Sequence, residues 1–80
     1  MKRYIATFYT HHAALCTHRA MVKADIVCRM APVPRALSAS CGTCVFFEAE
    51  HPSAELLDAD FERLVEENPG GGYDIILENT

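Results

Sequence analysis

Cys41 and Cys44 stand three positions apart, at the end of a stretch that begins with Pro32 and Pro34. A thiolate is a nucleophile, a metal ligand and one half of a disulfide, so two thiols at this spacing indicate sulfur chemistry. The prolines forbid a regular helix, because each fixes φ and lacks an N–H. Gly42, between the cysteines, permits backbone conformations that other residues avoid. We therefore expect a shaped loop that presents sulfur.

Basic and hydroxyl side chains are expected around these thiols. Arg35 precedes Cys41 by six positions and is able to fold back over a tight loop. His11 and His12 open the first predicted helix, whose N-terminal end carries partial positive charge. These groups would favour an anionic Cys41 sulfur. Cys41, Cys44 and Arg35 are therefore expected to carry the chemistry. The residues expected to bind a ligand or shape the site are His11, His12, Ser38, Ser40 and Gly42.

Two further chemistries remain open for the cysteine pair. The CxxC spacing of Cys41 and Cys44 is that of thioredoxin-type dithiols, although those lie at a helix N-terminus and this pair leads into a predicted strand. A structural zinc site normally takes four ligands from two such pairs, and the sequence has no second CxxC. His12 and Cys16, one helical turn apart, are able to face one ion. A dithiol redox protein and a binding or metal-binding module stay as alternatives, and no cofactor is expected.

The elements that must position this loop follow from hydrophobic spacing and turn residues. Four strands are predicted, at residues 4–9, 26–31, 45–48 and 73–77. The signals are β-branched and aromatic residues, alternation of side chains between two faces, and turn residues at the ends. Thr10 is a plausible N-cap for a helix over residues 11–24, and Pro52 suits the first turn of a second helix that ends before Asn68.

The second predicted helix has an apolar stripe on one side and acidic residues on the opposite side. Leu57, Phe61, Leu64 and Val65 follow helical spacing. The resulting order is β-α-β-β-α-β, an α+β, ferredoxin-like fold with a four-stranded antiparallel sheet and two helices on one face. In this topology the start of the first helix, the loop and the glycines at 70–72 would share one edge of the sheet.

Length and charge restrict the class of protein. Eighty residues suit a single domain, residues 1–80, with just enough chain for one core. The net charge of −4 and scattered basic residues argue against a nucleic-acid partner. No apolar run is long enough to span a bilayer, so no membrane association is expected. Four cysteines without an export signal indicate a cytoplasmic protein with free thiols. The sheet face without helices is expected to form a partner surface, most simply in a homodimer.

One pattern resembles a known family. Three features carry the resemblance: a strand that ends in Phe8, a helix start at Thr10-His11-His12, and the loop Pro32-Val33-Pro34-Arg35…Ser38…Ser40-Cys41-Gly42. The chain is similar to the selenium/sulfur carrier protein-like family over roughly residues 3–78. The resemblance implies the β-α-β-β-α-β fold and identifies Cys41 as the candidate carrier thiol.

Cys44 departs from that family pattern, which more often has an aliphatic residue at its position. A second thiol there would be placed to resolve a persulfide on Cys41 into a disulfide. The leading hypothesis is that Cys41 accepts a sulfur or selenium atom from a donor protein, as a persulfide or perselenide, and passes it to an acceptor. Such a protein is more readily a carrier or accessory protein than an enzyme with turnover.

Overall fold

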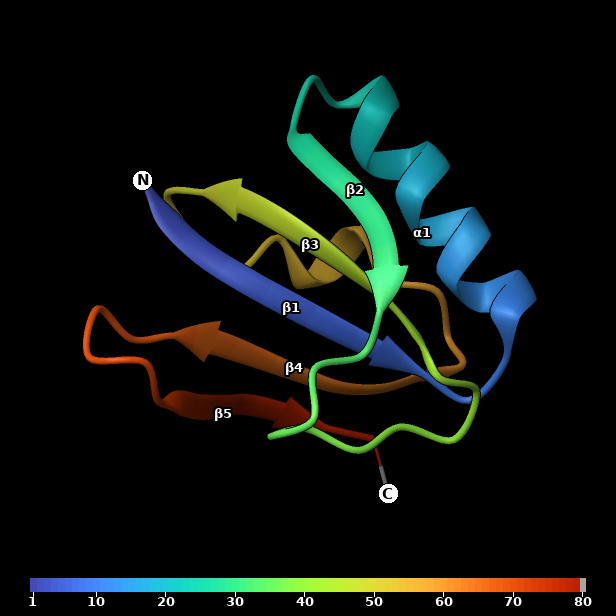
Figure 1. Cartoon of the computed structure of the whole chain (residues 1–80). Helices are drawn as coiled ribbons and strands as arrows, with labels where there is room; N and C mark the ends of the chain where they lie inside the picture. Colours follow the sequence, from blue (N-terminus) through green and yellow to red (C-terminus); the bar gives the residue numbers. More distant parts are fainter. Residues whose placement is uncertain (80) are drawn as a thin grey trace.

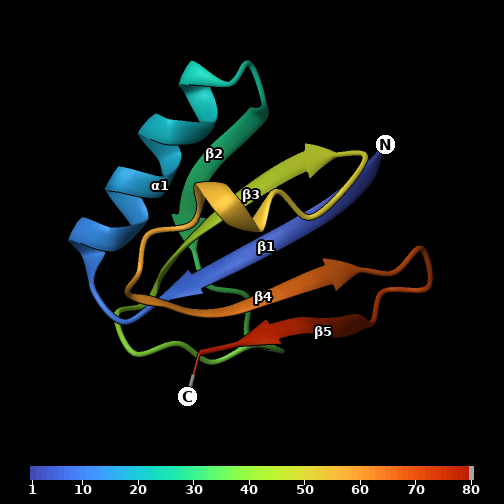
Figure 2. The same ribbon diagram turned by 180° about the vertical axis from the view of Figure 1, so that it is seen from behind.

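The computed structural model describes residues 1–79, which form one antiparallel sheet, one α-helix and one short 3₁₀ helix (Figure 1). The elements in chain order are β1 (Lys2–Phe8), α1 (His11–Lys23), β2 (Val27–Pro32), β3 (Thr43–Ala49), η1 (Ala54–Leu56), β4 (Phe61–Glu67) and β5 (Tyr73–Glu78). The strand order is β2-β3-β1-β4-β5, and every neighbouring pair is antiparallel. α1 and η1 lie on one face, here called the helix face, and the loop 33–42 crosses the opposite face, the loop face (Figures 1 and 2).

The first helix and the four predicted strands are present. Thr10 is the N-cap of α1, and its hydroxyl accepts a hydrogen bond of 3.0 Å from the N–H of Ala13. The buried side of the helix includes Thr17 and Met21, which lie one helical turn apart. The strands differ from the predicted ranges by one or two residues at their ends, where sequence signals are weakest.

The predicted second helix and the ferredoxin-like fold are wrong. Residues 54–56 form only a 3₁₀ turn, and residues 61–67 form β4, which pairs with β1. Leu64 and Val65 explain the difference, since both are fully buried but in apolar clusters on opposite faces of the sheet. Adjacent side chains point to opposite faces only in a strand. The strand is buried on both sides, so its apolar residues happen to match helical spacing as well.

β4 also provides the hydrogen-bonding partner that the central strand requires. Residues 4–8 of β1 are buried on both faces of the sheet. A strand in this position must pair along both edges, because an unpaired backbone group away from water costs about as much as a lost hydrogen bond. β3 and β4 supply the two edges. The last predicted strand, β5, is displaced to the outer edge and pairs with β4 alone.

The main core lies between α1, η1 and the sheet. It includes Tyr4 and Phe47, whose rings stack with centroids 5.2 Å apart, together with Phe8, Met21 and Leu64. A smaller cluster on the loop face consists of three fully buried side chains, Ile5, Cys44 and Val65. Two apolar layers therefore enclose the sheet, so the loop face is only partly open.

The turn at residues 68–72 connects β4 to β5 as a hairpin. The N–H of Asn68 donates to the carbonyl oxygen of Gly72 at 2.8 Å, and Gly71 has a φ of +92°. Because β4 runs antiparallel to β1, this turn lies beside the start of β1, at the end of the sheet opposite to α1's first turn (Figure 1). The expectation that the glycines would share an edge with the cysteine loop is wrong for this reason.

Within residues 1–79, no helix is long and apolar enough to cross a membrane.

Candidate functional site

The loop that carries the cysteines folds back onto the sheet. The N–H of Val33 donates to the carbonyl oxygen of Gly42 at 3.1 Å and closes the base of the loop. The N–H of Leu37 donates to the carbonyl oxygen of Pro34 at 3.0 Å, so the proline initiates a tight turn. Val33 and Leu37 pack on the small cluster of the loop face. The two prolines thus shape the loop, and these apolar side chains hold it against the sheet.

Gly42 is required by its backbone conformation. Its φ is +74°, in the left-handed region, and a Cβ built at this position would meet no heavy atom within 4 Å. The space would accept a side chain, so the constraint comes from the dihedral angle alone. This turn separates Cys41 from Cys44 and directs the chain into β3.

The loop is also anchored to β4 through Glu62. A carboxylate oxygen of Glu62 accepts a hydrogen bond of 3.0 Å from the N–H of Ser40, the residue before Cys41. Glu62 was not among the predicted site residues, because the helix interpretation placed it on a solvated acidic face. Glu62 lies where β4 shifts register against β1, between Phe61 and Arg63, and no sequence pattern signals this irregularity.

Cys41 lies in the loop as a half-exposed thiol. It packs against the main core of the helix face, and its Sγ donates to the carbonyl oxygen of Thr43 at 3.5 Å. Its exposure leaves the sulfur accessible to a reaction partner. Ser38 and Ser40 are exposed on the same loop.

Cys44 is in a different environment. It is fully buried in the loop-face cluster, and its Sγ donates to the carbonyl oxygen of Pro32 at 3.7 Å. Burial is the largest cause that raises the pKa of Cys44 to about 11; the charge of Arg29 lowers this pKa, and Cys41 raises it. The two thiols of the CxxC therefore pack into clusters on opposite faces of the sheet. A disulfide between them requires the loop to rearrange.

The predicted basic neighbours are divided between two places. The Nδ1 of His11 is 3.4 Å from the Oγ1 of Thr43, so this histidine reaches the end of the cysteine loop. The Nε2 of His12 is instead 3.4 Å from the Sγ of Cys16 on the same helix. Arg35 is exposed in the turn that follows Pro34, and the one ion pair among residues 1–79 does not involve it.

The remaining cysteine, Cys28, is partly buried against the main core. Its Sγ donates to the carbonyl oxygen of His18 at 3.9 Å, and burial raises its pKa. All four cysteines are free thiols. In the part of the chain that the structure describes, no three His, Cys, Asp or Glu side chains are grouped to hold a metal ion.

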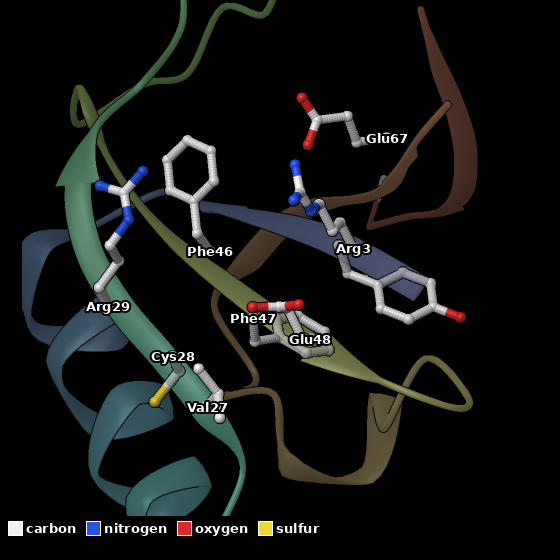
Figure 3. A pocket seen from close by; sticks show the side chains of 9 residues that line it. Arg3, Val27, Cys28, Arg29, Phe46, Phe47, Glu48 and Glu67 are labelled. Carbon is white, nitrogen blue, oxygen red and sulfur yellow. The ribbon is translucent and has the colours of Figure 1, made fainter. Parts of the chain in front are cut away.

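A hollow of about 320 Å³ lies on the loop face beyond the cysteine loop (Figure 3). The guanidinium carbon of Arg29 is 4.4 Å from the ring centroid of Phe46, a cation–π contact. Arg3 from β1 and the carboxylates of Glu48 and Glu67 complete a charged rim around the ring. The hollow is near the Glu48 end of β3, and the cysteine loop is at its Thr43 end. No sequence motif indicates this hollow, because its residues come from four strands.

The fold and the site define a small α+β domain that presents a half-exposed thiol from a proline-shaped loop. The family described as "Putative Se/S carrier protein-like" matches residues 3–59. The match covers more than half of the chain and includes β1 from its second residue, α1, β2, the whole cysteine loop and β3. This chain belongs to that family, as the loop pattern indicated. No curated protein and no solved structure matches it.

Proposed function

We propose that this protein is a sulfur or selenium carrier, and that Cys41 is the thiol that holds the transferred atom. The observation that supports the proposal most is the contrast between the two cysteines of the CxxC. Cys41 is half-exposed on the loop, whereas Cys44 is fully buried with a pKa of about 11. Only a deprotonated and accessible thiol attacks a sulfur donor efficiently. Family membership supports the same chemistry.

The proposed loading reaction exchanges one sulfur–sulfur bond for another. The Cys41 sulfur attacks the terminal sulfur of a persulfide on a donor protein, and the donor leaves as a thiolate. Cys41 then carries the terminal sulfur as a persulfide, with no net oxidation or reduction. Delivery is the same exchange with the Cys41 persulfide as the donor. The acceptor's thiolate attacks the terminal sulfur, and Cys41 leaves as a thiolate. A perselenide would form in the same way from a selenium donor.

The surrounding residues have supporting roles in this proposal. Gly42 and the turn at Pro34 set the loop conformation, and the Glu62 contact to Ser40 holds the segment next to Cys41. Arg35 lies exposed on the same loop, where its charge is available to a negatively charged persulfide or to an approaching partner. His11 fixes the loop end through Thr43.

The burial of Cys44 supports a carrier over a dithiol redox protein. A redox dithiol alternates between two thiols and a disulfide, which requires the two sulfurs to meet. In this fold Cys41 packs against the main core of the helix face, whereas Cys44 lies in the small cluster of the loop face. We assign Cys44 a packing role while the loop is in this conformation. The free thiols also suit a reducing compartment, and we propose the cytoplasm.

Carrier chemistry requires a donor and an acceptor protein, and we propose that the loop face receives such partners or a second copy of this chain. The support is the hollow around Phe46, a half-buried aromatic side chain with arginine and glutamate residues on its rim. Aromatic and arginine side chains are enriched at protein interfaces.

The test of the carrier proposal is loading from a cysteine desulfurase with cysteine as the sulfur source. Mass spectrometry of the tryptic peptide 36–63, which contains both Cys41 and Cys44, should show a gain of one sulfur atom in the wild-type protein and in the Cys44→Ser variant. The gain at this site should be lost in Cys41→Ser. Cys28→Ser is a matched control, because it removes a different thiol that is packed against the core. No added sulfur on this peptide in the wild-type protein, or an equal gain in Cys41→Ser, would reject the proposal.

A further inference from the structure

His12 and Cys16 form a close thiol–imidazole pair on α1. They are four residues apart, so they lie one above the other on the same side of the helix. The Sγ of Cys16 is 3.4 Å from the Nε2 of His12, within hydrogen-bond distance for the large sulfur atom. His12 is exposed and Cys16 is half-exposed, so a reagent or a partner can reach the pair.

This contact differs from that of every other cysteine in residues 1–79. The sulfurs of Cys28, Cys41 and Cys44 each donate to a backbone carbonyl oxygen. A carbonyl oxygen accepts a hydrogen bond but does not remove the proton from a thiol. The imidazole beside Cys16 is a base and can take that proton. Among the described cysteines, Cys16 is thus the one with a base at hydrogen-bond distance.

The geometry favours nucleophilic chemistry because both partners are held by the helix. A nucleophile beside a general base is the usual arrangement for an activated cysteine. When the Nδ1 of His12 carries the hydrogen, its Nε2 accepts the thiol proton and leaves a thiolate next to an imidazolium. α1 has a side-chain cap at Thr10, so the spacing of these two residues does not depend on a mobile loop.

We propose that Cys16 is a second nucleophilic thiol of this protein, that His12 is its base, and that Cys16 accepts the terminal sulfur of a persulfide. The Cys16 sulfur forms a bond to that terminal sulfur while the donor's sulfur–sulfur bond breaks. The Cys16 proton passes to His12 and then to the leaving donor thiolate. The products are a Cys16 persulfide and the reduced donor, with no oxidant consumed. The choice of sulfur as substrate rests on the proposed function, whereas the reactivity of the pair does not.

The first experiment measures the reactivity of Cys16 without any sulfur donor. The rate of alkylation by iodoacetamide is followed at Cys16 across pH 6 to 9, by mass spectrometry of the tryptic peptide. His12→Gln should lower the rate near pH 7 by about tenfold, less than the roughly 10²–10⁴-fold typical of a positioned base, because the pair is exposed. The difference should shrink towards alkaline pH, where hydroxide removes the proton instead. His18→Gln, on the same helix, should leave the rate unchanged. Equal rates in wild type and His12→Gln would overturn the proposal.

The second experiment tests sulfur uptake independently of Cys41. A Cys41→Ser variant is incubated with glutathione persulfide, blocked with iodoacetamide and digested with trypsin. Cleavage after Lys and Arg places Cys16 on the peptide 4–19 and position 41 on the peptide 36–63, so the two thiols are measured separately. One added sulfur on 4–19, reduced by His12→Gln, is the expected result. An unmodified 4–19 peptide would overturn the proposal, whereas failure of the carrier function would show on 36–63 of the wild-type protein.

Discussion

The buried thiol of Cys44 should make this protein less stable in alkaline solution. Its pKa of about 11 lies above the ordinary value of 9.0 that it regains in the unfolded chain. The folded state therefore holds the proton more tightly, and the stability from this difference is fully present below about pH 9. It is lost as the pH rises towards 11. A shift of about two units corresponds to a loss of about 1 kcal/mol by pH 10 and about 2 kcal/mol by pH 11.

The assay is urea unfolding of the wild type and Cys44→Ala at a series of pH values from 7 to 11. The free energy of unfolding should fall more steeply in the wild type, and the two curves should converge above pH 9. All other ionisable groups are the same in both proteins. Val45→Ala is a matched control, because Val45 is fully buried on the same strand and has no ionisable group. Its curve should run parallel to that of the wild type. Parallel curves for Cys44→Ala as well would refute the assignment of Cys44 as a buried, protonated thiol.

Four further outcomes follow from the structure. Gly42→Ala should reduce the free energy of unfolding in urea by about 1 kcal/mol, because a left-handed φ is unfavourable for a residue with a Cβ; an unchanged midpoint would contradict the role of the turn. Glu62→Gln should weaken the contact to Ser40, at a cost of about 1 kcal/mol, and speed hydrogen exchange of the Ser40 amide; unchanged protection would argue against the anchor. Leu64→Ala should cost about 2–5 kcal/mol, since a fully buried side chain leaves a cavity, and a surface-like effect below this range would question its position in the core. If a homodimer forms through the loop face, Phe46→Ser should abolish the concentration dependence of sedimentation, while a wild-type protein that is monomeric at every concentration would reject the dimer.

The first half of the fold was predictable because its local signals agree with its tertiary environment. Thr10 caps the helix, the following residues carry one apolar stripe, and the strand at residues 27–32 alternates clearly. The second half was not, because Leu64 and Val65 are apolar neighbours on opposite faces of a central strand. A helical stripe and a strand buried on both sides look alike over seven residues. The requirement of β1 for a second pairing edge decides between them, and this requirement is a tertiary one.

The candidate site was predictable in its residue types and less so in its contacts. The prolines and Gly42 indicated a shaped loop, and the loop is present with Gly42 in a left-handed conformation. The separation of Cys41 from Cys44 was hidden, because it depends on which face of the sheet each side chain enters. The alignment of His12 with Cys16 was visible as helical spacing, but the sequence does not show that His12 contacts this thiol and not the loop.

The most direct test of the central claim is to identify which cysteine carries the added atom. Wild-type protein is loaded by a cysteine desulfurase, its persulfides are trapped with iodoacetamide, and fragment ions of the peptide 36–63 are used to assign the modified residue. The account predicts one added sulfur on Cys41 and none on Cys44. A peptide 36–63 with no added sulfur, or with the sulfur on Cys44, would contradict it.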